Sequence, residues 1–483
     1  MSQKGPVVLG IDVGTGGVRV LAVTEAGNVA AGASAPLDAA VLTPRQDRHE
    51  QPPAAWWQAV RRALAETLQQ IDKPERLAAV AVDGTSGTLV AVDETGEPLR
   101  PAIMYNDPRA AAEAEQLNAL AGEFCAKLGY RFAASFALAK IAWLANNEPE
   151  IFGKAARFVH QADYIQEQLT GKPATSDYSN ALKTGYDLIE ECWPAWIDRQ
   201  LGVVDRLPPV VAPGTKVGTI SSAAAEQTGL PEGLPVVTGA TDGTAALLAS
   251  GARNPGDYNT TLGTTLVFKG ISKRICRQGD GLIYSHKLPG GLWLPGAAGN
   301  VGCEWIDGMF PGADVGAMDT DAGPRLPCDC LAYPLVRKGE RFPFLSKAAK
   351  GFFLSEPEDE RDRYAACLQG TALVERLGYE ILDEAIVAGG GEVFSTGGGS
   401  KSDIWMQCRS DVAGRVFHRP GCGQSAFGSA VLAAAGTCFS GLREAAESMI
   451  RLETAFAPRL EFTKRYDDLF GRFRQELSNR GYL

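Results

Sequence analysis

The stretch VVLGIDVGTGGVRVLAV, residues 7–23, decides the fold. Two runs of β-branched and aliphatic residues flank a glycine-rich segment, Gly14–Gly17, and this pattern predicts two strands joined by a tight turn. A further turn and a third strand-like run, Val29–Ser34, follow along the chain. We therefore expect an antiparallel meander at the start of the protein.

Helical and strand patterns alternate beyond the meander. Pro53 is suited to the first turn of a helix, and apolar residues recur with helical spacing after it. Strands are expected over 77–82 and 88–92, and helical patterns dominate from 110 to 169. This layout predicts a mixed α/β fold, in which ligand-binding loops follow the ends of strands.

The opening pattern recurs about half a chain later. Residues 260–268, TTLGTTLVF, again predict a strand, a Gly-Thr turn and a strand. Two halves that begin with the same device indicate duplication of one domain. Two unrelated hairpins are the alternative, because Gly-Thr is a common turn. With the boundary close to 235–244, we expect domains over 1–240 and 241–483.

The composition excludes several classes of protein. Of the 483 residues, 45% are hydrophobic and 22% charged, as in globular proteins rather than disordered ones. The net charge of −10 argues against a nucleic-acid-coating or membrane-surface protein, so we expect no nucleic-acid or membrane partner. No apolar run approaches the ~18 residues of a membrane span, and we find no signal-peptide pattern. The cysteines and histidines lack the spacing of zinc ligands. Scattered cysteines are typical of reduced, cytoplasmic proteins, so we expect the protein in the cytoplasm.

Glycine is unusually frequent. The chain has 55 glycines in 483 residues, whereas the average is about 7%. No collagen-like period or low-complexity block accounts for them. The fold is therefore expected to need many tight turns or close backbone approaches.

The Gly-Thr turns have the chemistry of phosphate-binding loops. Glycines leave backbone N–H groups uncovered, and these groups can bind phosphate oxygens together with a Thr hydroxyl. Asp12, just before the first turn, can hold a Mg²⁺ ion that itself binds phosphate. The second hairpin has Thr261 and Leu262 in place of Asp12 and Val13, so it supplies donors without the carboxylate. Ordinary tight turns are the alternative for either hairpin alone.

A third glycine cluster, Gly397–Gly399, lies between a strand pattern and a helix that a polar residue can cap. A flat ring can lie against such bare backbone. Close packing of helix on strand is the alternative.

Asp242 lies at the end of a buried strand pattern, near the expected domain boundary. A carboxylate there can accept a proton from a hydroxyl that attacks phosphorus. It can equally cap the helix expected after it. Polar residues that could recognise sugar hydroxyls gather in 83–87 and in 105–109, where Asp107 before Pro108 could also be only a cap.

Together these motifs resemble the FGGY family of carbohydrate kinases, over about residues 7–436. The matching segments are GIDVGT (10–15), AIMYNDPR (102–109), GATDG (239–243), LGTT (262–265) and GGGSKSDIW (397–405). The resemblance implies an α/β protein of two actin-like (RNase H-type) domains with a central interdomain cleft.

The resemblance also implies site residues and ligands. Asp242 is expected as the general base, Asp12 as the residue that places Mg²⁺, and Thr15 as a contact of the transferred phosphoryl group. ATP contacts are expected from Gly14, Thr15, Gly16, Gly263, Thr264, Thr265, Gly398, Gly399, Ser402 and Trp405, with Asn300 and Gly302 near the nucleotide. Sugar contacts are expected from Ser86, Asn106 and Asp107.

The segment Asp83–Thr88 indicates which sugar is the expected substrate. Xylulose kinases of the family typically carry Gly-Gln-Met-His-Gly at this place, and this chain has no histidine there. The segment, with Met104–Asp107, is closer to the family's pentulose kinases that favour D-ribulose. We therefore expect ATP-dependent phosphorylation of D-ribulose at its terminal hydroxyl, with D-xylulose or another ketose or polyol as the alternative.

Other classes of protein remain open at this point. An actin-like ATPase without a sugar substrate would use the same paired hairpins, but it has no evident use for the polar clusters at 83–86 and 106–109. A sensor derived from a kinase would not need Asp12, Thr15 and Asp242. The expected partners are a small sugar and MgATP, and the sequence leaves a homodimer open.

Overall fold

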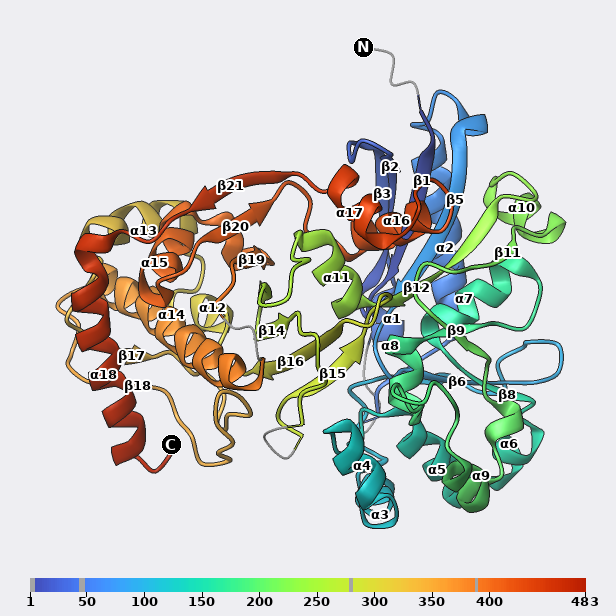
Figure 1. Cartoon of the computed structure of the whole chain (residues 1–483), viewed down its shortest axis with the longest axis horizontal. Coiled ribbons are helices and arrows are strands. Elements are labelled where there is room, and N and C mark those ends of the chain that lie inside the picture. Colours follow the sequence, from blue (N-terminus) through green and yellow to red (C-terminus); the bar gives the residue numbers. More distant parts are fainter. Residues whose placement is uncertain (1–4, 43–47, 278–280, 387–389) are drawn as a thin grey trace. The chain divides into compact units, whose positions relative to one another are not determined.

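The computed structural model of the protein describes residues 5–42, 48–277, 281–386 and 390–483 (Figure 1). The chain divides into two compact units, each assembled from three segments. Unit 1 comprises Met1–Ala249, His286–Gly291 and Gln424–Arg451, and unit 2 comprises Ser250–Ser285, Leu292–Gly423 and Leu452–Leu483.

The sheet of unit 1 has the order β11-β12-β5-β1-β2-β3. Strands β1 (Val7–Val13), β2 (Gly17–Thr24) and β3 (Val29–Pro36) pair antiparallel, so the predicted meander is confirmed. Strands β5 (Leu77–Gly84) and β12 (Pro235–Thr241) run parallel to β1. The edge strand β11 (Lys216–Thr219) pairs antiparallel with β12.

Helices pack on both faces of this sheet. Leu9 and Ile11 of β1 lie in an apolar cluster with residues of α2 (Pro53–Leu68), whereas Gly10 faces α16 (Ser425–Ala435). A Cβ atom on Gly10 would lie 1.8 Å from the Ala426 carbonyl oxygen, so only glycine allows α16 to approach this closely.

The position of α16 differs from our expectation. We expected all residues after 241 in a C-terminal domain, but the segment Gln424–Arg451 packs in unit 1, whose first segment ends at Ala249. The physical reason is the small-residue surface of α16, because its Ala426 and Ala430 lie against Gly10 of β1 and its Gly428 lies against the backbone of Ala245 in α11.

The remaining elements of unit 1 frame the sheet. Helix α7 (Gln161–Thr170) packs against β5 and β12. A second sheet has the order β4-β7-β6-β8, and β10 pairs with β9. These strands are β4 (Glu50–Gln51), β6 (Leu89–Val92), β7 (Ala102–Ile103), β8 (Arg157–His160), β9 (Ser176–Asp177) and β10 (Val210–Val211). The other helices that begin in unit 1 are α1 (Ala39–Leu42), α3 (Ala111–Leu120), α4 (Gly122–Leu128), α5 (Ala137–Asn147), α6 (Pro149–Lys154), α8 (Tyr178–Ala181), α9 (Ala195–Leu201), α10 (Ser222–Thr228), α11 (Asp242–Ser250) and α17 (Leu442–Met449).

Unit 2 repeats the strand pattern of unit 1. Its sheet has the order β15-β16-β14-β13-β19-β20-β21, in which β13, β14 and β16 pair antiparallel and β13, β19 and β20 run parallel. A last strand, β21, pairs antiparallel with β20, as β11 does with β12. The duplication expected from the two Gly-Thr hairpins is therefore present in the topology. The strands are β13 (Tyr258–Leu262), β14 (Leu266–Gly270), β15 (Tyr284–Lys287), β16 (Trp293–Gly299), β17 (Ala332–Tyr333), β18 (Phe352–Phe353), β19 (Val393–Thr396), β20 (Phe417–Pro420) and β21 (Leu452–Phe456).

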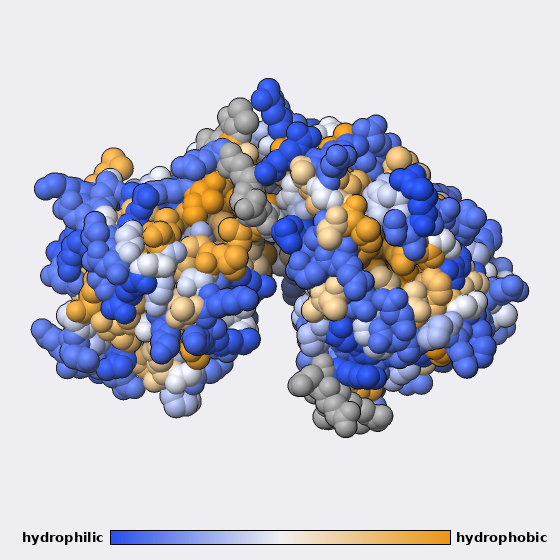
Figure 2. Space-filling model, turned by 90° about the horizontal axis from the view of Figure 1, so that it is seen from below, coloured by the Kyte–Doolittle hydropathy of each residue, from blue (hydrophilic) through white to orange (hydrophobic). Residues whose placement is uncertain are grey.

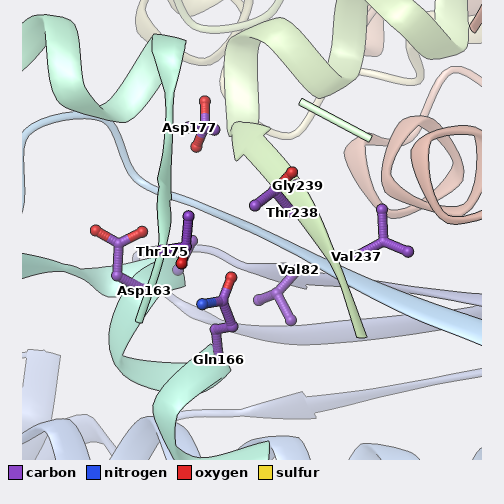
Figure 3. Close-up of a pocket in the computed structure, with 9 residues that line it drawn as sticks. Val82, Asp163, Gln166, Thr175, Asp177, Val237, Thr238 and Gly239 are labelled. Carbon is purple, nitrogen blue, oxygen red and sulfur yellow. The ribbon is translucent and has the colours of Figure 1, made fainter. Parts of the chain in front are cut away.

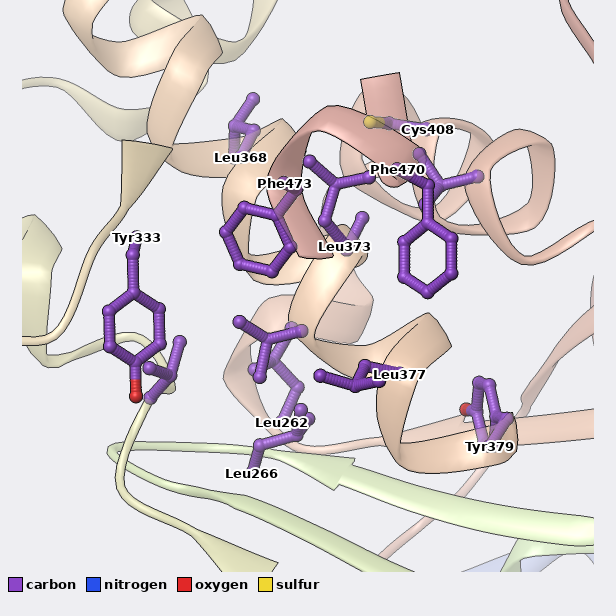
Figure 4. Close-up of a cluster of buried hydrophobic side chains, with 14 of the residues drawn as sticks. Leu262, Leu266, Tyr333, Leu368, Leu373, Leu377, Tyr379, Cys408, Phe470 and Phe473 are labelled. Atoms are coloured by element: carbon purple, nitrogen blue, oxygen red, sulfur yellow. The ribbon is translucent and has the colours of Figure 1, made fainter. Parts of the chain in front are cut away.

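The core of unit 2 lies between its sheet and a long helix, α14 (Glu360–Ala385). Figure 4 shows Leu262 and Leu266 of the sheet below Leu377 of α14, with Phe473 of α18 above. Side chains of this size each contribute about 1.5–3 kcal/mol when fully buried. The other helices of unit 2 are α12 (Glu304–Met309), α13 (Val315–Ala322), α15 (Asp403–Ala413) and α18 (Thr463–Asn479).

The visible surface is mainly hydrophilic (Figure 2). On the face drawn in Figure 2, hydrophilic residues cover most of each unit, and hydrophobic ones are scattered among them. No helix within the described ranges combines the length and apolarity needed to cross a membrane.

Candidate active site

Three carboxylates of unit 1 gather at one edge of its sheet. Strands β1, β5 and β12 are parallel, so their carboxyl ends meet at the same edge. Asp12 lies opposite Asp83 in the β1–β5 register, and Asp242 follows directly after β12. The charges of both Asp12 and Asp242 act on Asp83 and raise its pKa. Two of these three residues, Asp12 and Asp242, were predicted from the sequence.

Asp12 and Asp83 form a buried pair of carboxyl groups. Burial raises the pKa of Asp83 well above its usual value, and the charge of Asp12 raises this pKa further. The Ser429 hydroxyl of α16 donates to Asp83 Oδ2 at 2.6 Å. Burial also raises the pKa of Asp12, while a hydrogen bond from Asp83 and the charge of Arg19, 3.6 Å away, lower it. Burial and the charges of Asp12 and Asp242 therefore all disfavour a negative charge on Asp83.

The first hairpin leaves its backbone accessible. The Gly14 N–H donates to the Gly17 carbonyl oxygen at 2.9 Å and closes the turn. Thr15 is half-buried, Gly16 is exposed, and the Thr15 carbonyl accepts a hydrogen bond from the Gln51 side chain at 2.9 Å. The turn is thus held from one side, and its residues remain available to a ligand.

Asp242 is the first residue of α11. Its Oδ1 accepts the Gly243 N–H at 2.6 Å, and its backbone carbonyl accepts the Ser425 hydroxyl of α16 at 3.1 Å. The side chain is half-buried. The N-terminus of a helix favours negative charge, so this position stabilises the ionised carboxylate.

The two segments expected to bind sugar lie side by side. The Tyr105 N–H donates to Thr88 Oγ1 at 3.2 Å, which joins the turn after β7 to the turn after β5. Ser86 is half-buried, and its Oγ has no protein hydrogen-bond partner. Asn106 is exposed, with its amide nitrogen 3.3 Å from His49 Nδ1. The Ser86 hydroxyl, although buried, therefore has unused hydrogen-bonding capacity, and Asn106 is accessible to a polar ligand.

Asp107 faces the protein. Its side chain is buried, Oδ1 accepts the backbone N–H and Nε of Arg109, and Oδ2 accepts Arg109 Nη2 and the His49 N–H. Arg109 also contacts Glu50 at 2.6 Å. Hydrogen bonds from Arg109 and the His49 N–H lower the pKa of Asp107 despite its burial. Asp107 therefore holds the turn before α3 but does not cap this helix, which begins at Ala111 without a side-chain cap.

The second hairpin, in unit 2, is held in a comparable way. The Gly263 N–H donates to the Thr265 carbonyl at 3.0 Å, and the Cys303 N–H donates to the Gly263 carbonyl at 2.7 Å. Thr264 is exposed. A Cβ atom on Gly302 would lie 2.4 Å from the Thr264 carbonyl oxygen, so Gly302 packs directly against the hairpin.

The third glycine cluster lies at the same edge of the unit 2 sheet. Gly397 follows β19, which runs parallel to β13, and has φ +89°, in the region that favours glycine. Gly398 is exposed, whereas Gly399 packs on Leu262. Ser402 caps α15 by accepting the Trp405 N–H at 3.1 Å.

Trp405 lies in the core rather than at the surface. Its side chain is 2% exposed, its ring N–H donates to the Leu368 carbonyl at 3.0 Å, and its ring packs edge-on against Trp305. We expected Trp405 beside adenosine. Its burial places it beneath Gly399, so that it supports the glycine cluster from behind.

An open pocket of about 430 Å³ adjoins the second hairpin. Thr264 lies in its lining, together with residues that the sequence did not reveal: Cys303, Glu304, Asp307, Gly308 and Val336. Cys303 precedes α12 directly after Asn300–Gly302, and Glu304, Asp307 and Gly308 lie on α12 itself. The sequence pattern that could have revealed these residues is a polar helix start directly after Asn300 and Gly302, which were expected near the nucleotide.

A small cavity of about 10 Å³ lies beneath β12 of unit 1 (Figure 3). Asp163, Gln166, Asp177 and Thr238 are among its lining residues, and this volume holds about one water molecule. Burial raises the pKa of Asp163 to about 7, and the charge of Asp177 also raises it. The cavity is a polar buried feature behind the strand that leads to Asp242.

Comparisons with known proteins identify the family. The model of the FGGY family of carbohydrate kinases, N-terminal domain, matches residues 7–249, and that of the C-terminal domain matches residues 313–437. The chain belongs to the FGGY family of carbohydrate kinases. It is therefore a sugar kinase, and the expected activity class is confirmed.

Similar proteins span nearly the whole of this FGGY kinase. A xylulose kinase of Streptomyces rubiginosus is 30% identical over 498 residues, covering 99% of the chain and 97% of the relative. A xylulose kinase of Staphylococcus epidermidis is 26% identical, covering 96% and 95%. The crystal structure of xylulose kinase from Rhodospirillum rubrum is 28% identical, with a TM-score of 0.86 and 98% of each chain covered. The expected two-domain, actin-like α/β fold is thereby confirmed.

Proposed function

We propose that this FGGY kinase transfers the γ-phosphoryl group of ATP to the terminal hydroxyl of D-xylulose. The observation that carries the proposal is the similarity over almost the full chain to proteins named xylulose kinase, which reaches 30% identity. This similarity favours D-xylulose over D-ribulose, which we expected from the segment 83–88. The prediction of D-ribulose is not confirmed.

D-Ribulose is the second candidate because of one local feature. Gly87 has φ +86°, and a Cβ atom there would lie 2.2 Å from the Ser135 carbonyl oxygen. This glycine is shared with the Gly-Gln-Met-His-Gly segment of the family's xylulose kinases, whereas Ser86 stands at the position of their histidine. Without that histidine the sugar hydroxyls would be recognised by other residues, of which we propose the unpartnered Ser86 hydroxyl and the exposed Asn106.

In the proposed reaction Asp242 accepts the proton of the attacking hydroxyl. A carboxylate general base must carry a negative charge, and the N-terminus of α11, where Asp242 lies, favours negative charge. One carboxylate oxygen of Asp242 is held by the Gly243 N–H, which fixes the direction of the other. Loss of the proton makes the sugar oxygen the nucleophile for the γ-phosphorus, and ADP leaves.

The donor set at Asp12 fits the Mg²⁺ ion that accompanies ATP. Magnesium is bound by one or two carboxylates together with substrate phosphates, and the Asp12 side chain is 15% exposed at the sheet edge. Mg²⁺ would neutralise charge on the phosphate oxygens. Thr15 and the N–H group of Gly16 would donate to the transferred phosphoryl group, while the Gly14 N–H keeps the turn closed.

For unit 2 we propose nucleotide binding. Thr264 and Thr265 of the second hairpin would donate to the phosphates, and the pocket beside Thr264 would take the nucleoside. Gly398 and Gly399 would lie against the adenine, with Ser402 holding α15 and Trp405 supporting the cluster from the core.

A panel of acceptors tests the proposal. ADP release is measured with D-xylulose, D-ribulose, glycerol and gluconate at fixed ATP. We expect kcat/KM for D-xylulose to be at least about 10-fold above that for any other acceptor, a difference of ~1.4 kcal/mol. A higher value for D-ribulose overturns the choice of sugar. ADP release that is indifferent to every sugar supports the actin-like ATPase instead.

A further inference from the structure

One buried lysine of unit 1 has no role in the site described above. Lys140 lies on α5, and its side chain is fully buried. Its Nζ donates to the Gly87 carbonyl at 2.6 Å and to the Ser135 carbonyl at 3.2 Å. No carboxylate lies within ion-pair distance of Lys140 in the ranges that the structure describes. A buried amine that binds only backbone calls for an explanation.

The two carbonyls belong to segments that meet beside the expected sugar contacts. Gly87 ends the turn that carries Ser86, and Ser135 lies in the turn that leads into α5. The segments touch directly, since a Cβ atom on Gly87 would lie 2.2 Å from the Ser135 carbonyl oxygen. Lys140 therefore joins two loops that also pack closely through their backbones.

The protonation of Lys140 does not decide whether the bonds form. Burial lowers the pKa of Lys140 to about 7, while the charge of Asp107 raises it and those of Lys183 and Arg109 lower it. A neutral amine has two N–H donors, which match the two carbonyl acceptors. The lysine can therefore hold both loops on either side of neutral pH.

We propose that Lys140 is a positioning residue for the sugar acceptor. It fixes the turn that carries Ser86 against the turn before α5, so that the unpartnered Ser86 hydroxyl is presented to a hydroxyl of the ketose. The assignment rests on the proposed function for the identity of the acceptor. The contacts that carry it are the two Nζ–carbonyl bonds, the buried Ser86 Oγ without a partner, and the close Gly87–Ser135 approach.

Lys140→Met keeps the volume of the side chain and removes both donors. Two buried carbonyls then lack partners, and the turns are expected to separate. We expect KM for the ketose to rise at least about 10-fold, with KM for ATP within about twofold of wild type. The exposed Lys154, also in unit 1, provides the matched control Lys154→Met, which is expected to leave both constants unchanged.

Amine rescue separates positioning from general stability. Lys140→Ala lacks the atoms of n-propylamine, so added n-propylamine should restore at least half of the lost ketose affinity, whereas n-propanol should not. Failure of rescue together with an equal loss of ATP affinity would mean a purely structural role, and it overturns the proposal.

Hydrogen exchange tests the inference independently of the reaction. In Lys140→Met without substrate, amides of 84–88 and 133–137 should exchange at least about 10-fold faster than in wild type, with unit 2 unchanged. Unchanged exchange in these two segments overturns the positioning role even if the enzyme phosphorylates D-xylulose. If the amides of these segments exchange faster in Lys140→Met but the protein phosphorylates no pentulose, the positioning role of Lys140 is retained and only the proposed function is refuted.

Discussion

Gly302→Ala gives the sharpest test of the proposed nucleotide site. The added Cβ would lie 2.4 Å from the Thr264 carbonyl oxygen and 2.6 Å from that of Gly263. Both atoms are backbone, so a side-chain rotation cannot relieve the clash. An ordinary van der Waals contact begins at 3.4 Å, and the hairpin must therefore move by about 1 Å, a displacement that can cost ~10²-fold in rate or affinity.

The energetic cost follows from overpacking. Inserting a methyl group into a filled site costs about 1–3 kcal/mol, which corresponds to about a 5- to 150-fold loss of affinity. Because the Gly302 contact is with the second hairpin, we expect the loss in ATP and ADP binding. KM for the ketose, whose expected contacts lie in unit 1, should change by less than about twofold.

Isothermal titration with ADP measures the effect without catalysis. Gly471→Ala is the matched control. Gly471 also belongs to unit 2, where it lies in α18, and its added Cβ would meet nothing within 4 Å. Thermal unfolding shows whether each variant is folded. If folded Gly302→Ala binds ADP as tightly as wild type, the second hairpin is not the nucleotide site.

Three further predictions concern catalysis, pH and core stability. Asp242→Ala should lower kcat by about 10²–10⁴-fold and leave ADP affinity within about twofold; near-normal turnover would contradict the base assignment. Burial raises the pKa of Asp163 from 3.8 to about 7, so its stabilising effect is complete below pH 3.8 and is lost as the pH rises toward 7. The free energy of unfolding of the wild type should fall over this window by up to ~1.4 kcal/mol per pH unit. The matching fall in melting temperature should flatten in Asp163→Asn, and equal slopes would refute the assignment. Arg409→Met removes one partner of the buried Arg409–Glu375 pair and should destabilise unit 2 by about 3–5 kcal/mol, which the double variant with Glu375→Leu should partly restore; an unchanged melting temperature for the single variant would contradict this.

Local patterns predicted the strands and loops well. The meander, the second Gly-Thr hairpin and the third glycine cluster depend on strand periodicity and on turn residues that act over a few positions. For the same reason Asp12 and Asp242 could be found, because each lies directly at the end of an apolar strand.

Long-range packing could not be predicted in this way. The apolar, small-residue pattern of α16 does not reveal that its partner is Gly10, more than 400 residues earlier. The helical spacing identified Trp405 in the sequence, but it could not show that the side chain of Trp405 is buried in the core. Asp107 looked accessible because Arg109 and His49 surround it only in the fold. Asp83 became part of the carboxylate pair only through the β1–β5 register.

Phosphorus NMR of the reaction products tests the central claim most directly. Wild-type protein, ATP, Mg²⁺ and D-xylulose are followed until the ATP is consumed. We predict one pentulose phosphate ester at the terminal hydroxyl for every ADP formed, and no such ester with Asp242→Ala. ADP accompanied by inorganic phosphate, without a sugar ester, would contradict the assignment of this chain as a pentulose kinase.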